Sequence, residues 1–184
     1  MVDFTSISYL KNGNLKQQMA YKILSENRIM DILCDFDPIL VGTVPINIDI
    51  ENSDLDIICF WEDQRDFREK LVAQFSEFGA FGIRDISIHG QLATVTNFFI
   101  DKIEIEIFGQ NIPTKSQYGY RHMLIENKLL SEKGDDFRRK IIKLKQQGYK
   151  TEPAFAKILG LEGDPYQELL KFETAYSETK KRIN

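Results

Sequence analysis

The most constraining feature of this sequence is a pair of acids inside an apolar segment. Residues 53–60, SDLDIICF, are dominated by β-branched and apolar side chains after the acids, which predicts a buried strand. Side chains alternate between the two faces of a strand, so Asp54 and Asp56 share one face. Two carboxylates that lose hydration side by side repel each other unless a cation neutralises them. The pattern therefore predicts a site for Mg²⁺ or Mn²⁺, because hard divalent ions bind carboxylates together with substrate phosphates.

A glycine and a hydroxyl residue precede these acids at a defined distance. Gly42-Thr43 follows the apolar run 39–41, and residues 44–53, which end in Ser53, separate it from Asp54. This spacing resembles the nucleotidyltransferase fold of the DNA polymerase β type, whose minimal members carry Gly-Ser, an intervening segment of this length and Asp-x-Asp. The resemblance implies that Gly42 admits a phosphate close to the backbone, that the Thr43 hydroxyl binds it, and that Ser53 belongs to the same nucleotide-binding set. Threonine replaces the family's serine, and the arginine and glycine that often follow that serine are absent.

A later strand offers the third acid that this resemblance implies. In residues 102–108, KIEIEIF, Glu104 and Glu106 share one face and the isoleucines take the other. A site for phosphoryl transfer uses a further carboxylate to complete the metal cage and to orient the attacking hydroxyl. We favour Glu106 for this role beside Asp54 and Asp56, with Glu104 in reserve. The alternative is an exposed edge strand whose acids are solvated.

The remaining pattern predicts an α/β (α+β) fold, a nucleotidyltransferase-like mixed sheet with flanking helices and a helical C-terminal part. Residues 1–113 form the core, and residues 114–184 pack on it within a single compact unit. Strands are predicted at Ile83–His89, Gln91–Ile100 and Lys102–Phe108, the last two joined as a hairpin at Asp101-Lys102. Helices are predicted at Leu15–Leu33, Glu62–Ala80, Ser116–Lys133, Asp135–Gln147, Pro153–Leu159 and Pro165–Lys181. The first is predicted to have its N-cap at Asn14, and the last two at Thr151 and Asp164.

The start of the C-terminal part mixes aromatic, polar and basic residues. Within residues 117–126, QYGYRHMLIE, Arg121 could clamp a phosphate, and Tyr118 or Tyr120 could stack on a base. The alternative is an amphipathic helix in which Arg121 is solvated. For His122 we favour a packing role.

A basic run over residues 137–150 allows two interpretations. It could form a phosphate or nucleic-acid patch, or it could be a solvated helix face whose apolar residues turn to the core. We favour the solvated face for its basic residues, which are Arg138, Arg139, Lys140, Lys143, Lys145 and Lys150.

Composition excludes several classes of protein. A net charge of −4 argues against a general nucleic-acid binder. Cys34 and Cys59 both lie in apolar stretches and are predicted to be buried, reduced thiols, and the two histidines show no zinc-like spacing with them. Neither a signal sequence nor a membrane span is expected, which predicts a cytoplasmic protein.

Several further segments look like one bacterial family, the domain of unknown function 4269, which is grouped with nucleotidyltransferase-like folds. The segments are Ser-Asp-Leu-Asp-Ile, Phe-Gly-Gln near 108–110, Tyr-Arg-His-Met at 120–123, and Gly-Asp-Pro-Tyr at 163–166. A weaker resemblance is to GrpB-type proteins, through Gly42, Thr43, Pro45 and Ile-Asp-Ile at 48–50. On that alignment Asp49, rather than Asp54, is the site acid.

Together these resemblances imply a metal-dependent enzyme that transfers a nucleotidyl group from an NTP to a hydroxyl acceptor on a small molecule, an RNA or a protein. Asp54, Asp56 and Glu106 carry the chemistry in this interpretation. The alternative is a catalytically inactive member of the fold that binds a nucleotide or a partner, including a partner of the toxin–antitoxin type. The acceptor, the preferred base and the oligomeric state stay open at this stage.

Overall fold

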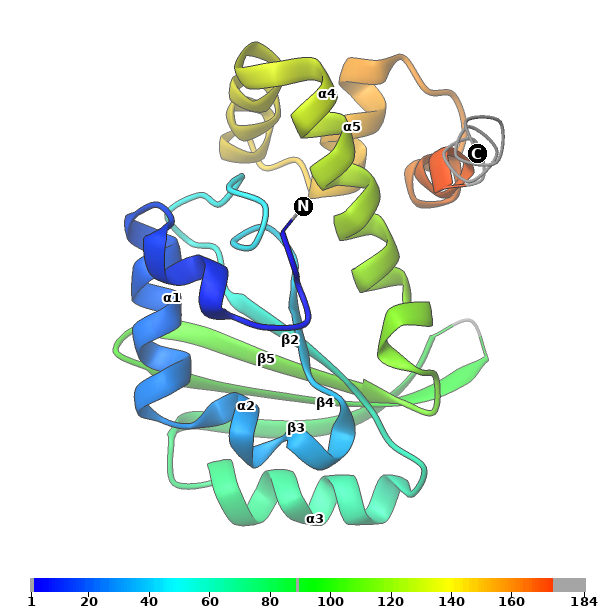
Figure 1. Cartoon of the computed structure of the whole chain (residues 1–184). Coiled ribbons are helices and arrows are strands. Elements are labelled where there is room, and N and C mark those ends of the chain that lie inside the picture. Colours follow the sequence, from blue (N-terminus) through cyan, green and yellow to red (C-terminus); the bar gives the residue numbers. More distant parts are fainter. Residues whose placement is uncertain (1, 89, 174–184) are drawn as a thin grey trace, which may run out of the picture.

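A five-stranded mixed sheet forms the centre of the computed structural model, which describes residues 2–88 and 90–173 (Figure 1). Its strands are β1 Ile39–Val41, β2 Leu55–Phe60, β3 Gly79–Ile88, β4 Gln91–Ile100 and β5 Ile103–Gln110. They lie in the order β1-β2-β5-β4-β3. The β2–β5 pair is parallel, and the other three pairs are antiparallel. Because β5 is central, the interpretation of the 104–106 acids as belonging to an exposed edge strand is wrong.

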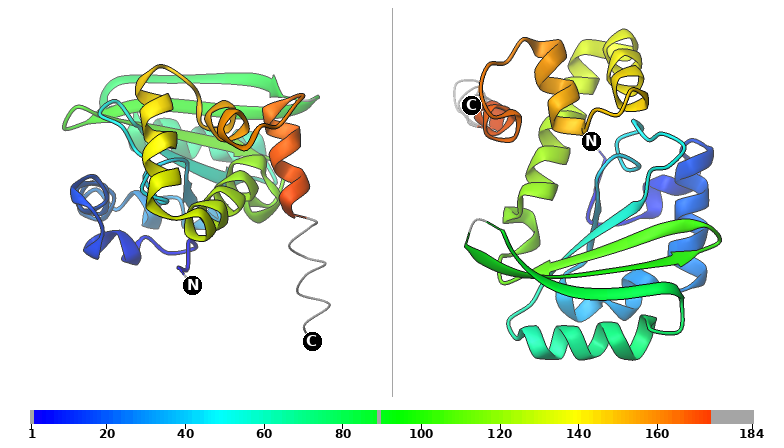
Figure 2. Two further views of the ribbon diagram at one scale, coloured as in Figure 1. Left: turned by 90° about the horizontal axis from the view of Figure 1, so that it is seen from above. Right: turned by 180° about the vertical axis from the view of Figure 1, so that it is seen from behind.

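Helices cover both faces of the sheet (Figure 2). The α-helices are α1 Leu15–Glu26, α2 Ile29–Ile32, α3 Gln64–Phe75, α4 Tyr118–Gln146 and α5 Thr151–Leu159, and a further helical segment spans 165–173. Short 3-10 helices lie at Ser8–Asn12, Cys34–Phe36 and Thr114–Ser116. The first three α-helices pack on one face, and α4 and α5 rise from the other (Figure 1).

The alternation of side chains along β2 and β5 separates two hydrophobic cores. Ile57 of β2 and Ile105 of β5 are fully buried against α1, α2 and α3. On the opposite face, Ile58 joins the core that α4 and α5 complete. Side chains two residues apart in a strand lie on the same face, and the acids at 54, 56, 104 and 106 are on the same face as Ile58. They therefore point towards the C-terminal helices.

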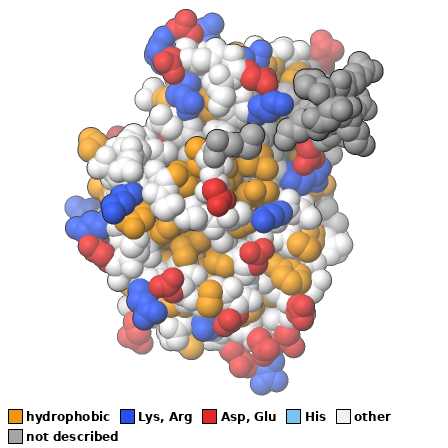
Figure 3. Space-filling view, viewed as in Figure 1, with side chains coloured by type: hydrophobic (Ala, Val, Ile, Leu, Met, Phe, Trp, Pro, Cys, Tyr) orange, Lys and Arg blue, Asp and Glu red, His pale blue; other side chains and the backbone are white. Residues whose placement is uncertain are grey.

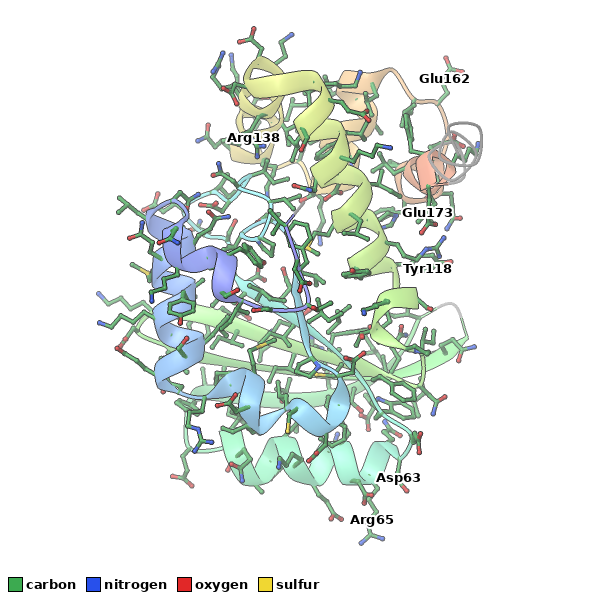
Figure 4. All side chains as sticks on the ribbon, viewed as in Figure 1. Asp63, Arg65, Tyr118, Arg138, Glu162 and Glu173 are labelled. Atoms are coloured by element: carbon green, nitrogen blue, oxygen red, sulfur yellow. The ribbon has the colours of Figure 1, made fainter. Side chains whose placement is uncertain are left out.

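A glycine break inside α4 sets the geometry of the second face. Gly134 has φ 75° and ψ −170°, a conformation for which glycine is the default residue. The chain turns there, and the second half of α4 lies over the loop between β1 and β2 (Figure 4). Arg138 donates hydrogen bonds to the carbonyl oxygens of Ile46 and Asn47, and so fastens this loop from above. Gln17 of α1 holds the same loop through the carbonyl oxygen of Val44, at 2.9 Å.

Most predicted elements are confirmed, with shifts at their ends. The helix predicted at 15–33 is divided into α1 and α2, and the side chain of Asn14 caps α1. The helix predicted to reach Ala80 ends at Phe75. Ala80, with φ +53°, instead lies in a register irregularity near the start of β3. Hydrogen bonding of the β3 segment to β4 outweighs its local helix preference.

Two smaller predictions are wrong. Thr151 is inside α5, whose N-cap is Lys150, so the threonine does not cap the helix. Cys34 is exposed, because its short helical turn lies at the surface, whereas Cys59 in β2 is buried as predicted. Asp164 does accept a hydrogen bond from the backbone N–H of Gln167, as an N-cap should. The predicted helix 165–181 is confirmed over residues 165–173, and its remainder lies outside the described residues.

Candidate functional site

The predicted acids converge on one cavity between the sheet and the C-terminal helices. The parallel register of β2 and β5 places Asp56 directly beside Glu106. Asp54, which directly precedes β2, lines the same cavity of about 870 Å³. Asp54 also lines a second cavity, of about 740 Å³, together with Glu104. The acids therefore lie where two cavities meet, and Glu106 rather than Glu104 faces the larger one.

The carboxyl group of Asp56 has a strongly shifted pKa. Burial, followed by the charges of Asp54 and Glu106, raises the pKa of Asp56 to about 8, while Lys145 acts in the opposite direction. Such a shift identifies a place where negative charge is concentrated and poorly hydrated. A cation bound beside Asp56 would relieve both effects.

Gly42 makes room for this carboxylate. It follows β1 with φ +80°, and a Cβ atom placed on it would lie 2.2 Å from Oδ2 of Asp56. The neighbouring Thr43 donates its hydroxyl to Oγ of Ser53 at 3.2 Å, and Ser53 also accepts from the backbone N–H of Ile50 at 2.9 Å. The predicted residues Gly42, Thr43 and Ser53 thus lie together in the loop between β1 and β2, beside the acids. All three line the larger cavity.

The third acid is held by neighbouring strands. Asn97 of β4 donates to Glu104 at 2.9 Å and to Glu106 at 3.1 Å. Arg84 of β3 lies 3.7 Å from Glu106. These contacts fix the direction of the Glu106 side chain.

Lys145 is a residue of the cavity that the sequence interpretation missed. It was predicted to be solvated, but it is only 7% exposed and lines the larger cavity from the second half of α4. Burial lowers the pKa of Lys145, and the acids around it, Glu126 first, followed by Asp49, Asp54 and Asp56, oppose that shift. Within the part of the chain that the structure describes, none of the ion pairs includes Lys145. Lys145 follows Phe137 and Ile141 at intervals of four residues, so it shares a helix face with two apolar residues. This spacing was the feature of the sequence that indicated its burial.

A second polar group lines the same cavity from α4 and α5. Burial and the charge of Glu152 raise the pKa of Glu126 well above its usual range, whereas Lys145 lowers it. His122 lies one turn before Glu126, and its Nε2–H donates to the carbonyl oxygen of Tyr166 at 2.9 Å. Nδ1 of His122 lies 3.6 Å from Glu152. His122 therefore has a packing role, as expected, but it also borders the cavity.

Arg121 and Tyr118 also line the cavity. Arg121 is half-buried and pairs with Glu173 through Nη2 and Oε2 at 2.6 Å, so its guanidinium group is already engaged by a carboxylate. Its guanidinium carbon lies 5.6 Å from the centre of the Tyr118 ring. Tyr118 itself is 42% exposed at the start of α4, where a flat ligand could reach it.

Asp49, the alternative site acid, lies on the other side of the turn. It accepts a hydrogen bond from Asn14 at 3.2 Å and lines the second cavity but not the larger one. In this geometry Asp54, rather than Asp49, shares a cavity with Asp56.

The donor set of the larger cavity suits a hard cation. Carboxylate oxygens from Asp54, Asp56 and Glu106, with hydroxyl groups nearby, are the ligand type of Mg²⁺ and Mn²⁺. Among residues 2–88 and 90–173, however, no three carboxylate, histidine or cysteine side chains are grouped closely enough to enclose an ion. This arrangement fits an ion that is held jointly by one or two carboxylates and a phosphate-bearing substrate.

The surface shows no extended basic face on the side drawn in Figure 3. Basic and acidic side chains are interspersed there, and hydrophobic side chains gather between them. None of the helices within the described ranges is long and apolar enough to cross a bilayer.

The chain belongs to the family described as Domain of unknown function (DUF4269), whose model matches residues 22–172. The predicted family is therefore confirmed. The matched residues include the Gly42 turn, both strands that carry the acids, and α4 and α5. Among curated proteins, none matches the chain significantly.

Solved structures of similar fold include a terminal U-transferase, a poly(U) polymerase and a chain of the GLD-2/RNP-8 complex. A cytoplasmic RNA terminal U-transferase is 13% identical, with a TM-score of 0.47, over 72% of this chain and 39% of that one. The Cid1 poly(U) polymerase with Mg 3′-dATP bound is 14% identical, with a TM-score of 0.49, over 72% and 41% of the two chains. A chain of the GLD-2/RNP-8 complex is 11% identical, with a TM-score of 0.49, over 77% and 55%.

The present chain thus spans between 39% and 55% of the length of these structures. At such low identity the likeness concerns the fold alone. The predicted mixed sheet with flanking helices is confirmed by the strand pairing and the helices of this chain itself.

Proposed function

We propose that this member of the DUF4269 family transfers a nucleotidyl group from an NTP to a hydroxyl acceptor with the help of Mg²⁺ or Mn²⁺. The observation that carries the proposal is the convergence of Asp54, Asp56 and Glu106 on one cavity. Its volume of about 870 Å³ lies within the roughly 300–1,000 Å³ typical of ligand sites. The acceptor is a hydroxyl group of a small molecule, an RNA or a protein.

The residues at one end of the cavity bind the metal and the phosphates. Asp54 and Asp56 hold the ion, which when bound supplies charge neutralisation to the phosphates. Gly42 leaves space for the Asp56 carboxylate, and the hydroxyl of Thr43 faces the phosphates. Lys145, on the second half of α4, contributes a positive charge to the cavity. This charge replaces that of the arginine that is absent after Thr43.

Glu106 orients the attacking hydroxyl. It lies beside Asp56 in the sheet, and Asn97 and Arg84 hold its side chain in one direction. Preorganised carboxylates of this kind accelerate phosphoryl transfer by positioning and by electrostatic stabilisation, with little covalent chemistry from the protein.

The second candidate function is nucleotide or partner binding without catalysis. It is favoured by two contacts of Glu106: Arg84 offsets part of its charge, and Asn97 occupies an oxygen that could otherwise bind a metal. The two functions share the nucleotide site and differ in whether pyrophosphate is released.

Calorimetric titration with Mn²⁺ tests the metal site directly. We expect binding by the wild type and at least about 10-fold weaker binding by Asp56→Ala. Asp136→Ala is the matched control, because the Asp136 side chain is 83% exposed and does not line the cavity. Equal Mn²⁺ binding by the wild type and Asp56→Ala would refute the metal site.

Incubation with α-labelled NTPs and Mg²⁺ then separates the two candidate functions. An enzyme releases pyrophosphate or transfers label, and Asp54→Asn abolishes both. Tight NTP binding with no pyrophosphate release in the presence of cell extract as a source of acceptors would favour the binding module.

A further inference from the structure

Glu126 is the buried carboxylate of the cavity that the metal proposal leaves without a role. It is 3% exposed, lines the same cavity as Asp54 and Asp56, and belongs to the first half of α4. Its Oε1 has no hydrogen-bonding partner among the residues that the structure describes. Leaving a buried carboxyl oxygen without a donor is unfavourable, so a ligand that supplies the donor accounts for its position.

A flat aromatic surface adjoins this carboxylate. Tyr118, His122 and Glu126 follow one another at intervals of four residues, so they occupy one face of α4, and all three line the cavity. The rings of Tyr118 and His122 are stacked, with centroids 6.0 Å apart and an interplanar angle of 18°. A row of stacked rings that ends in a hydrogen-bond acceptor suits a heteroaromatic ring with N–H groups on its edge.

Lys145 connects this row with the metal acids. Lys145 lines the cavity together with Asp56 and Glu126, and its positive charge favours the ionised form of both. A molecule with phosphates at Asp54 and Asp56 would pass Lys145 and bring its other end towards Glu126. A nucleoside triphosphate has this layout, with phosphates at one end and a base at the other.

We propose that Glu126 binds the nucleobase of the substrate and selects guanine. This inference rests on the proposed function, in which the cavity binds an NTP. The Watson–Crick edge of guanine presents two adjacent N–H donors, which pair with the two oxygens of one carboxylate. Adenine and cytosine place a ring-nitrogen acceptor beside their amino group, and uracil flanks its N–H with two carbonyl oxygens. Each of those acceptors would face a carboxylate oxygen. Burial and the charge of Glu152 raise the pKa of Glu126, whereas Lys145 and the two N–H donors of guanine favour its charged form, so the pairing is coupled to loss of the Glu126 proton.

Nucleotide analogues that cannot be cleaved between the α- and β-phosphates test this inference. Calorimetry with the α,β-methylene analogues of GTP and ATP, in Mg²⁺, compares guanine with adenine without turnover. We expect the wild type to bind the guanosine analogue about 10- to 100-fold more tightly, the range that one good bidentate pair confers.

The variant Glu126→Gln changes this preference in a defined way. An amide offers one acceptor and one donor, which no longer match two N–H groups but do match the edge of adenine. We expect Glu126→Gln to lose the preference for guanine. Glu132→Gln is the matched control, since Glu132 is on the same helix with its side chain 49% exposed, and it should retain the preference.

The outcomes separate this inference from the proposed function. Equal binding of both analogues by the wild type, or a guanine preference that survives in Glu126→Gln, would overturn the role of Glu126 and leave the metal site intact. If the wild type bound neither analogue and also failed to bind Mn²⁺, both proposals would be overturned.

Discussion

Replacing Gly42 with alanine is the most informative single change, because it acts on the acids without removing any of them. The added Cβ atom would lie 2.2 Å from Oδ2 and 3.2 Å from Cγ of Asp56. Non-bonded contacts of this kind are normally about 3.5 Å, so the carboxylate must move by roughly 1 Å. Alanine at φ +80° also costs about 1 kcal/mol in backbone strain.

The displacement has a predictable effect on metal binding. Oxygen ligands of Mg²⁺ lie within a narrow range of distances, so a shift of about 1 Å removes one ligand from its position. We expect Gly42→Ala to bind Mn²⁺ about 10- to 100-fold more weakly than the wild type, as is typical when the support of a metal ligand is disturbed. The melting temperature should fall as well, by at least about 2–4 °C for 1 kcal/mol of strain.

Gly160→Ala separates the two effects. Gly160 ends α5 with φ +68°, and a Cβ atom there would meet no heavy atom within 4 Å. This variant should lose a similar amount of thermal stability through backbone strain, yet bind Mn²⁺ like the wild type. Calorimetry and thermal unfolding of both variants give the answer. If Gly42→Ala bound Mn²⁺ as tightly as Gly160→Ala, the close approach of Gly42 to Asp56 would have no role in metal binding.

Two further predictions concern stability. Gly109→Ala should lower the free energy of unfolding by about 1–3 kcal/mol, because a Cβ atom there would lie 2.2 Å from the Phe67 ring. Gly82→Ala is the control, since a Cβ atom there would meet open space. Urea titration measures the free energy of unfolding of both variants. Asp56→Asn should raise the melting temperature in EDTA at pH 9 but not at pH 4. Since burial raises the pKa of Asp56 to about 8, its contribution to stability is present at low pH and is lost as the pH rises through about 8. Equal melting temperatures of Asp56→Asn and the wild type at pH 9 would contradict the prediction that ionised Asp56 destabilises the folded protein.

Part of the site was predictable because it depends on local rules. The alternation of side chains in a strand placed Asp54 and Asp56 on one face, and the same rule placed Glu104 and Glu106 together. The assignment of Gly42 to the same site followed from the resemblance of this spacing to the nucleotidyltransferase pattern. These residues do line the cavities where the structure brings the strands together.

Other residues were missed because their environment depends on distant contacts. Lys145 lies in a basic run, and basic helices are usually solvated. Its burial follows from the break at Gly134, which folds the second half of α4 over the cavity. Arg121 was considered as a phosphate clamp, but its partner Glu173 lies 52 positions further along the chain.

By itself, the sequence determined the local features of this protein: which segments are strands, which face of each strand carries the acids, and where a glycine precedes them. Hydrophobic periodicity and backbone preference act over a few residues, so they can be recognised without the fold. Only the tertiary structure decided that β2 pairs with β5, that Glu106 rather than Glu104 shares a cavity with Asp56, and that Lys145 and Glu126 face the same space. These features depend on packing between segments that are far apart in the chain, where the free energy of the whole core selects the arrangement.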